Sequence, residues 1–222
     1  MNQEKITYII IGGTSGIGKV VANHFEDGEN LVHVVSRQTG LDISDEEAVH
    51  CYFESVGAFD HLVVTAGSFA PAGKVTDVTI EDAKGAFDTK FWGSVIAAKH
   101  ASRYIKPNGS ITLTTGMLSR KVVANTYTKT AINAALEAVT KVLAKELAPI
   151  RVNAVSPGLT MTAAYENMDV LSRDEMYKNA KNNLPVGKVG EASEIAMAYV
   201  MAINNQYMTG SIIDVDGGAL IN

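Results

Sequence analysis

The sequence predicts an α/β protein with a doubly wound parallel sheet, in which helices cover both faces of the sheet in a three-layer αβα arrangement. Apolar runs without a polar break alternate with segments of helical spacing along the whole chain, which is typical of a parallel sheet. A glycine-rich turn follows the first apolar run. The 222 residues, 46% of them hydrophobic, suit one core, so we expect a single domain over residues 1–222.

Three strands and two helices are expected in the first part of the chain. The strands are runs of Val, Ile and Leu that suit burial on both faces. The first helix begins at Ile17, where the apolar spacing becomes helical, and Asp27-Gly28 stops it. The second follows a capping box that starts at Ser44. In order, we expect strand Ile6–Ile11, helix 17–27, strand Leu31–Val35, helix 44–56 and strand His61–Thr65.

The same alternation continues to the end of the chain and supports a parallel sheet throughout. No internal repeat, linker or low-complexity segment interrupts it. In order, we expect helical stretches across Ile80–Ile105, strand Ser110–Thr115, the Ala-rich helix Thr128–Leu147, strand Arg151–Val155, helix Glu191–Ile203 and strand Ser211–Val215.

Composition excludes several functional classes. The net charge is −5 and the 19 Lys and Arg are scattered, so we expect no nucleic-acid partner. The only cysteine, Cys51, cannot form an internal disulfide, which suits a cytoplasmic protein. The first apolar run is too short for a signal peptide or a membrane span. The five histidines lie far apart, so we expect no metal site.

The first turn between a strand and a helix reads Gly12-Gly13-Thr14-Ser15-Gly16-Ile17-Gly18. Glycines there allow close backbone approach, and the helix N-terminus attracts a pyrophosphate, as in a Rossmann fold. The GxxxGxG spacing resembles that of the short-chain dehydrogenase/reductase family. Three further segments resemble the family's motifs in the same order: Val64-Thr65-Ala66-Gly67, where the family has Asn-Asn-Ala-Gly, then 151–158 with Thr162, and 207–218. The resemblance implies an oxidoreductase that binds a nicotinamide cofactor.

The end of the second expected strand indicates which cofactor binds. An NAD site usually places Asp or Glu there to hold the ribose 2′-hydroxyl, whereas this chain has Ser36-Arg37. A guanidinium can hold a 2′-phosphate in two hydrogen bonds, so we expect NADP(H). From the glycine turn and the resemblance, the expected cofactor-binding residues are Gly12, Thr14, Ser15, Gly16, Ile17, Gly18, Ser36, Arg37, Gln38, Asp42, Ile43, Ala66, Gly67, Ser68, Lys90, Asn133, Pro157, Gly158, Leu159 and Thr162.

This chain departs from the family that it resembles at the family's catalytic positions. The family uses a Tyr, a Lys four residues later, a Ser and an Asn. The segment Leu143–Leu147 fixes the helix register, which puts Lys129 at the Tyr and Asn133 at the Lys; beginning at Tyr127 instead puts Ala131 at the Lys. The same comparison puts Gly116 at the Ser and Lys90 at the Asn.

Two of these changes are reciprocal, because the family's Asn has become Lys90 and its Lys has become Asn133. We therefore expect the Lys90 ammonium to lie within reach of Asn133 and of the nicotinamide ribose. The expected catalytic residues are Lys90 and Asn133, with Lys129, Tyr127 or Thr115 as the proton donor.

Two functions remain open at this point. The first is an NADP(H)-dependent oxidoreductase that transfers a hydride to or from a small carbonyl or alcohol substrate. The alternative is an NADP(H)-binding pseudoenzyme that acts as a redox sensor or a structural subunit, because every usual catalytic position has changed.

The resemblance also implies a substrate-covering segment over about residues 159–184, from Leu159 to Leu184. Met and Tyr side chains there suit an adaptable apolar pocket, or alternatively form the buried faces of two short amphipathic helices. These side chains are Met161, Tyr165, Met168, Met176 and Tyr177. Family resemblance further implies a homodimer or homotetramer, built on the Ala-rich helices Phe87–Ile105 and Thr128–Leu147.

Overall fold

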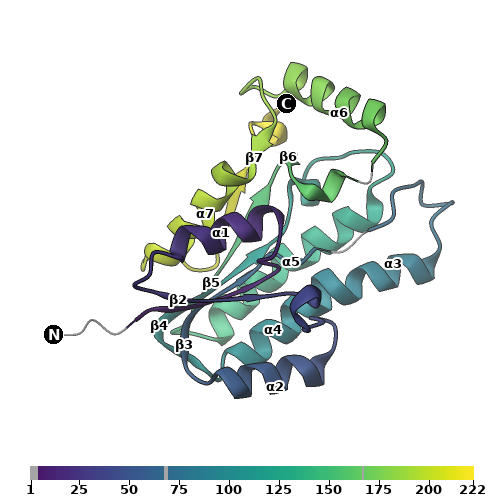
Figure 1. Ribbon diagram of the computed structural model, residues 1–222. Helices are drawn as coiled ribbons and strands as arrows, with labels where there is room; N and C mark the ends of the chain where they lie inside the picture. The colour runs from purple at the N-terminus through teal and green to yellow at the C-terminus, as the bar shows by residue number, and fades with distance from the viewer. Residues whose placement is uncertain (1–4, 68–69, 167) are drawn as a thin grey trace.

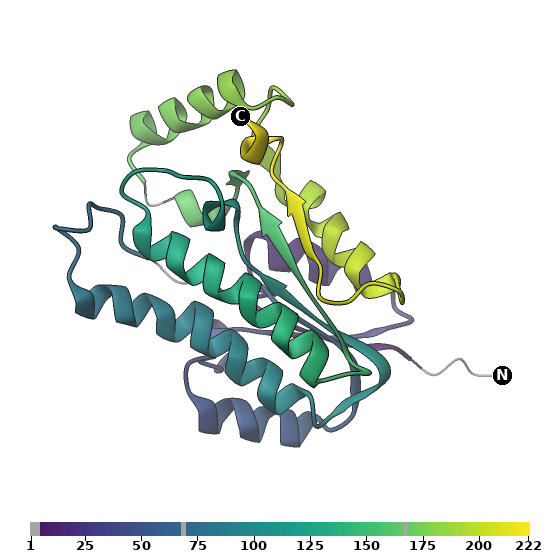
Figure 2. The same ribbon diagram turned by 180° about the vertical axis from the view of Figure 1, so that it is seen from behind.

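The computed structural model describes residues 5–67, 70–166 and 168–222. Its main sheet has strands in the order β2-β1-β3-β4-β5-β8, all parallel, with helices on both faces (Figures 1 and 2). This arrangement confirms the doubly wound, three-layer prediction. The strands are β1 (Thr7–Ile11), β2 (Leu31–Val35), β3 (Phe59–Val64), β4 (Ile105–Thr114), β5 (Arg151–Pro157) and β8 (Ile212–Val215).

Alternate side chains of each strand enter the two helical layers. Tyr8 and Ile10 of β1 pack with helices α1 (Gly16–Phe25) and α7 (Ala192–Asn204). Ile9 and Ile11 of the same strand belong to the cluster on the other face. That face is covered by α2 (Glu46–Val56), α4 (Gly93–Ala101) and α5 (Tyr127–Glu146). Because successive side chains point to opposite faces, an unbroken apolar strand supplies both layers at once.

The expected helix Ile80–Ile105 is divided. It consists of α3 (Ile80–Phe87), a π-helical turn over Asp88–Trp92 and α4, which run on as one rod in Figure 2. The helix ends at Ala101, and Ile105 already belongs to β4, where it pairs with Phe59. The expected end of the helix was therefore wrong, because Ile105 pairs with β3 as part of strand β4. The π turn matters for the site, since such turns often occur where a side chain has a functional position.

The N-terminus of α2 also differs from the prediction. Asp45, not Ser44, caps the helix, and its carboxylate accepts a hydrogen bond from the Ala48 amide at 3.0 Å. Ser44 instead donates its hydroxyl to the Asp42 carboxylate at 2.6 Å. A carboxylate at the cap interacts favourably with the helix dipole, and the neighbouring Asp42 holds the serine in the turn before it.

The direction of the chain across the sheet reverses at β1. The chain passes from β1 to β2 on one side and then crosses back to β3 on the other side of β1. In doubly wound sheets a ligand binds at this reversal, beyond the carboxyl ends of the strands. Strand β2 is the edge of the sheet, because Leu41–Ile43 passes on to α2 without forming another strand. The expected glycine turn follows β1 and so lies at this reversal.

Residues 159–166 and 168–184 lie beyond the carboxyl ends of the strands (Figure 1). The short strands β6 (Thr160–Met161) and β7 (Gly190–Glu191) pair at the base of this part, and α6 (Val170–Asn183) buries none of its side chains. Met161 and Met168 are exposed, so their interpretation as buried helix faces was wrong. Tyr165 packs edge-on against Tyr177 with ring centroids 6.2 Å apart.

No helix within the described ranges is both long enough and apolar enough to cross a lipid bilayer.

Candidate cofactor and active site

The glycine turn follows β1 and packs closely against Thr65 and Ala66, which follow β3. Gly12 has a positive φ of 89°, and a Cβ on it would lie 2.7 Å from the Ala66 amide nitrogen. A Cβ on Gly18 would lie 2.4 Å from the Gly12 carbonyl oxygen. Only glycine allows this approach at both positions. Thr65 fills the space beneath the turn and donates its hydroxyl to the Ile11 carbonyl at 3.2 Å, a role that the sequence analysis missed.

The N-terminus of α1 has backbone donors available to an anion. Its cap residue, Ser15, makes no side-chain capping bond, and no acidic residue lies in the first turn. Gly16 has a φ of 53°, and a Cβ on it would lie 3.7 Å from the Thr162 side chain, so Thr162 lies beside the turn. Free amide groups and the helix dipole together suit a pyrophosphate.

The residues expected to select the cofactor lie together at the end of β2. The Ser36 hydroxyl accepts hydrogen bonds from the Thr14 hydroxyl and the Gln38 amide, both at 3.1 Å. Arg37 and Gln38 are exposed. Among the described residues, no carboxylate lies within 4.0 Å of the Arg37 guanidinium. The guanidinium is thus available to a phosphate.

Asp42 follows this group and is held in place by its own turn. Its carboxylate accepts from the Ser44 hydroxyl and the Ser44 amide, and these bonds, with a smaller effect of the Arg37 charge, lower the pKa of Asp42. Ile43, by contrast, is 4% exposed, and its side chain packs where a Cβ on Gly93 would come within 2.7 Å. Only the backbone of Ile43 can therefore face a ligand.

The remaining expected cofactor residues lie at the ends of β3 and β5. Ala66 and Gly67 follow β3, and Pro157 ends β5. Gly158 has a structural reason to be glycine, because a Cβ there would lie 2.6 Å from Asp216 Cα. The carbonyl of Leu159, another expected cofactor residue, accepts from the Gly190 amide at 3.1 Å. Ser68, also expected to bind the cofactor, lies outside the described residues.

The reciprocal pair is in contact. Lys90 Nζ donates to Asn133 Oδ1 at 2.7 Å and to the Thr115 carbonyl at 2.9 Å. This confirms that Lys90 lies within reach of Asn133, and it links the π turn to α5. An ammonium has three hydrogens to donate, so one N–H of Lys90 remains for a further acceptor.

The surroundings of Lys90 reduce its basicity. Although part of the side chain is accessible, desolvation of the ammonium lowers the pKa of Lys90 to about 8, and the charge of Lys129 acts in the same direction. Asn133 is 5% exposed, and its amide oxygen accepts from Lys90. A Cβ on Gly116 would lie 3.0 Å from Asn133 Nδ2, so the amide occupies the space beside this glycine.

The three candidate proton donors have different environments. Thr115 is 2% exposed and donates its hydroxyl to the Val155 carbonyl at 3.3 Å, so it is closed to a substrate. The Tyr127 hydroxyl is buried and makes no hydrogen bond within the described part of the chain. Lys129 is partly exposed in the first turn of α5, and Asn133 follows it by four residues on the same side of the helix.

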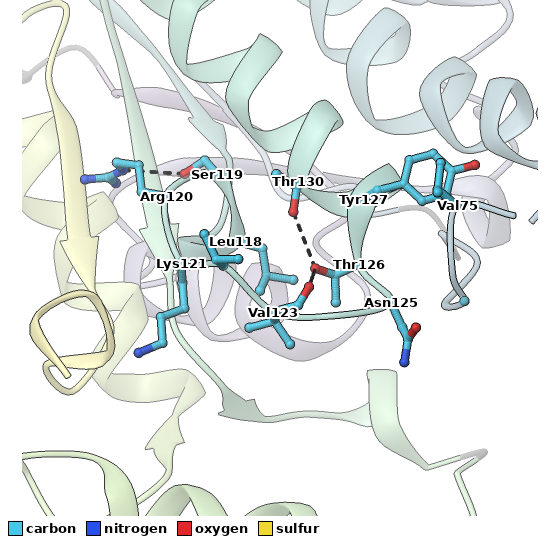
Figure 3. A pocket seen from close by; sticks show the side chains of 12 residues that line it. Val75, Leu118, Ser119, Arg120, Lys121, Val123, Asn125, Thr126, Tyr127 and Thr130 are labelled. Carbon is cyan, nitrogen blue, oxygen red and sulfur yellow. Dashed lines mark hydrogen bonds between the residues drawn. The ribbon is translucent and has the colours of Figure 1, made fainter.

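A cavity of about 270 Å³ adjoins the first turn of α5 (Figure 3). Its walls come from the loops that follow β3 and β4 and from α5. Figure 3 shows Tyr127 at one end of this pocket and Arg120 and Lys121 at the other. The lining residues are Gly73, Val75, Leu118, Ser119, Arg120, Lys121, Val122, Val123, Asn125, Thr126, Tyr127 and Thr130.

Arg120 anchors one wall of this pocket, and the sequence analysis did not identify it. Its guanidinium donates to Asp214 at 2.8 Å and forms an ion pair with Glu137 at 3.2 Å. The network joins the loop after β4 to β8 and α5. Its acceptors lie 94 and 17 residues away in the chain, so no local pattern could have revealed it.

Across the residues that the structure describes, no group of three or more His, Cys, Asp and Glu side chains could hold a metal ion.

Comparison with known proteins places this geometry in context. Residues 22–219 match a family model described as enoyl-(acyl carrier protein) reductase. The chain is 29% identical to short-chain dehydrogenase/reductase ucsE of Acremonium sp, over 98% of this chain and 96% of that protein. It is 30% identical to carbonyl reductase family member 4 of Danio rerio, over 95% of this chain and 96% of that protein. A crystal structure of a small-chain dehydrogenase in complex with NADPH has 68% identity and a TM-score of 0.97, over 99% of this chain and 100% of the other.

Proposed function

Since the chain belongs to the short-chain dehydrogenase/reductase family, we propose that it is an NADP(H)-dependent oxidoreductase that transfers a hydride to or from a carbonyl or alcohol substrate. The observation that carries the proposal is the hydrogen bond between Lys90 and Asn133. It holds the ammonium of Lys90 beside the position at which the family has its own lysine. The NADPH complex of the protein with 68% identity supports the choice of cofactor.

The cofactor fits the residues present. The uncapped N-terminus of α1 suits its pyrophosphate, and Arg37 suits its 2′-phosphate. The third N–H of Lys90 would donate to a ribose hydroxyl, while Asn133 and the Thr115 carbonyl hold the ammonium in place. When bound, the cofactor supplies or accepts the hydride.

In this proposal Lys129 exchanges the proton with the substrate oxygen. Lys129 is partly exposed, whereas the Thr115 hydroxyl is bonded to Val155 and the Tyr127 hydroxyl is buried. Lys129 also precedes Asn133 by about one helical turn of α5. Burial of the Tyr127 hydroxyl beside the pocket makes that residue the second candidate. Exclusion of water by residues 159–184 would favour both the hydride transfer and the proton exchange.

The pseudoenzyme remains as a second candidate because of one observation. Gly116 supplies no hydroxyl to polarise a carbonyl, and the neighbouring Thr115 hydroxyl is bonded to β5. A redox sensor would bind NADPH and catalyse no turnover. We further propose a cytoplasmic homodimer or homotetramer that contacts its copies through α4, with the π turn before it, and α5, where Trp92 of the π turn and Val142 of α5 expose apolar surface.

Exchange of the two residues tests the proposal. Lys90→Ala should weaken NADPH binding, measured by calorimetric titration, and should reduce any turnover. Lys90→Asn and Asn133→Lys should each weaken binding, whereas the double variant should recover much of the loss, because the residues act as a pair. Lys141→Gln, an exposed change on the same helix, is the control.

Losses that simply add in the double variant would contradict the role of the pair. Tight NADPH binding without turnover of any carbonyl or alcohol in a broad panel would favour the pseudoenzyme.

A further inference from the structure

Strand β2 forms one edge of the main sheet, and within the described residues it pairs with β1 alone. The Leu31 amide and the Val35 carbonyl both bond to residues at the ends of β1, at 2.9 and 2.7 Å. Because the backbone groups of successive strand residues point to opposite sides, Val32 and Val34 present their N–H and C=O groups to the outer side. These groups are available to a further strand.

The β2 edge lacks the features that normally prevent another strand from pairing with an edge. Edge strands of monomeric proteins carry charged side chains, a proline or a bulge. Strand β2 reads Leu-Val-His-Val-Val, and it pairs with β1 in an unbroken register. Strand β8, at the other edge, carries Asp214, whose carboxylate is paired with Arg120. Of the two edges, β2 is therefore the one suited to strand addition.

A cavity of about 540 Å³ lies between β2, the turn that follows it and α2. None of its lining residues is Asp, Glu, Lys or Arg, although these types make up 19% of the chain. On the helix side, the small residues Ala48, Cys51 and Ser55 follow one face of α2 and leave room for a neighbour. The Tyr52 hydroxyl beside them is buried and has no hydrogen-bond partner in the described part of the chain. The cavity suits a neutral, largely apolar strand better than a charged ligand.

We propose that β2 pairs antiparallel with β2 of a second copy of this chain, which joins the two main sheets into one. A two-fold axis at His33 puts Val32 opposite Val34 of the second copy, and the reverse, so the outward N–H and C=O groups of both strands bond to one another. Leu31, which is 49% exposed, then lies opposite Val35 of the second copy as an apolar cross-strand pair. The second copy is the occupant because this neutral strand is complementary to itself about that axis. The contact is separate from the association through α4 and α5 and does not depend on the oxidoreductase function.

Cross-linking through Cys51 tests this contact, because Cys51 lines the cavity, is exposed and is the only cysteine in the chain. A flexible bis-maleimide should link two copies, seen as a dimer on a denaturing gel. His33→Lys puts two ammonium groups opposite each other at the axis and should reduce the linked fraction roughly tenfold, whereas the neutral His33→Asn should retain it. Urea unfolding checks that His33→Lys folds. In the control, Cys51→Ser with Lys178→Cys moves the thiol to an exposed position on α6 and should abolish linking.

Amide hydrogen exchange tests the backbone pairing itself. The second copy should protect the Val32 and Val34 amides, and their exchange should accelerate at least about tenfold on dilution as the copies separate. The Ile9 amide, in a strand paired on both sides, should exchange slowly at every concentration. An unlinked wild type, linking that survives His33→Lys or is equally strong in the control, or Val32 and Val34 amides that exchange rapidly at every concentration would overturn the inference.

Discussion

At the end of β2, Arg37 carries a positive charge that no carboxylate within 4.0 Å neutralises among the described residues. A 2′-phosphate is the group that distinguishes NADPH from NADH, and a guanidinium binds it with charge-assisted hydrogen bonds worth about 1.5–3 kcal/mol each. Arg37→Ala should therefore weaken NADPH binding roughly 10- to 100-fold and leave NADH binding nearly unchanged. Calorimetric titration with both cofactors measures the effect, and equal losses would show that Arg37 does not contact the phosphate.

Lys90 gives the protein a pH dependence whose sign follows from its lowered pKa. The pKa of Lys90 is about 8 in the folded protein and 10.5 ordinarily, so between these values the unfolded chain binds more protons. The free energy of unfolding should then rise with pH in this range, while below pH 8 the full cost of burying the ammonium remains. Because the side chain is partly accessible, we expect a gain of about 1–2 kcal/mol rather than the full value.

Urea unfolding of the wild type and Lys90→Met between pH 7 and pH 10 checks this prediction. As pH rises, the wild type should gain unfolding free energy relative to Lys90→Met, since Met does not titrate. A difference that is independent of pH would mean that the ammonium is solvated in the folded protein.

At the scale of elements, the Arg120 network fixes the loop after β4 against α5 and β8. Arg120→Met should lower the free energy of unfolding by about 1–3 kcal/mol, because it leaves Glu137 and Asp214 without their cation, and the Glu137 side chain is only 14% exposed. Urea unfolding measures this loss. The matched control is Lys188→Gln, which removes the exposed pair with Glu194 and should cost less than about 0.5 kcal/mol.

The π turn is the second decisive element. It interrupts the rod formed by α3 and α4 and carries Lys90, whose ammonium reaches α5 and the end of β4. The spacing of apolar residues predicted a helical stretch there but not the altered turn. A π turn depends on one shifted backbone hydrogen bond, which leaves little trace in the sequence.

At the scale of the whole molecule, we predict that two or more copies associate through α4 and α5. Val142 on α5 is 50% exposed, and Trp92, the last residue of the π turn before α4, is 52% exposed, so both offer apolar surface to a second copy. Sedimentation velocity at micromolar concentration should show a dimer or tetramer, and Val142→Glu should shift it toward monomer. Leu171→Glu on α6 should leave the association unchanged, and a monomeric wild type would contradict the prediction.

The sequence by itself determined the fold class, the glycine turn and the pairing of Lys90 with Asn133. The first two follow from local patterns, namely unbroken apolar strands such as Ile6–Ile11 and glycines at fixed spacing, whereas the pairing follows from the resemblance to the family, whose Asn and Lys have exchanged places in this chain. Such patterns lie within a few residues of one another or within recognisable motifs, so they are readable before the chain folds.

Only the tertiary structure decided which of the candidate groups are accessible. It buried the Thr115 hydroxyl against Val155, placed the Ile43 side chain in the core and joined Arg120 to Asp214 across 94 residues. It also exposed Met161 and Met168, which one of the two interpretations of the sequence had placed on the buried faces of amphipathic helices. The physical reason is that burial, desolvation and ion pairing depend on which elements pack together, and neighbours in space are not neighbours in sequence.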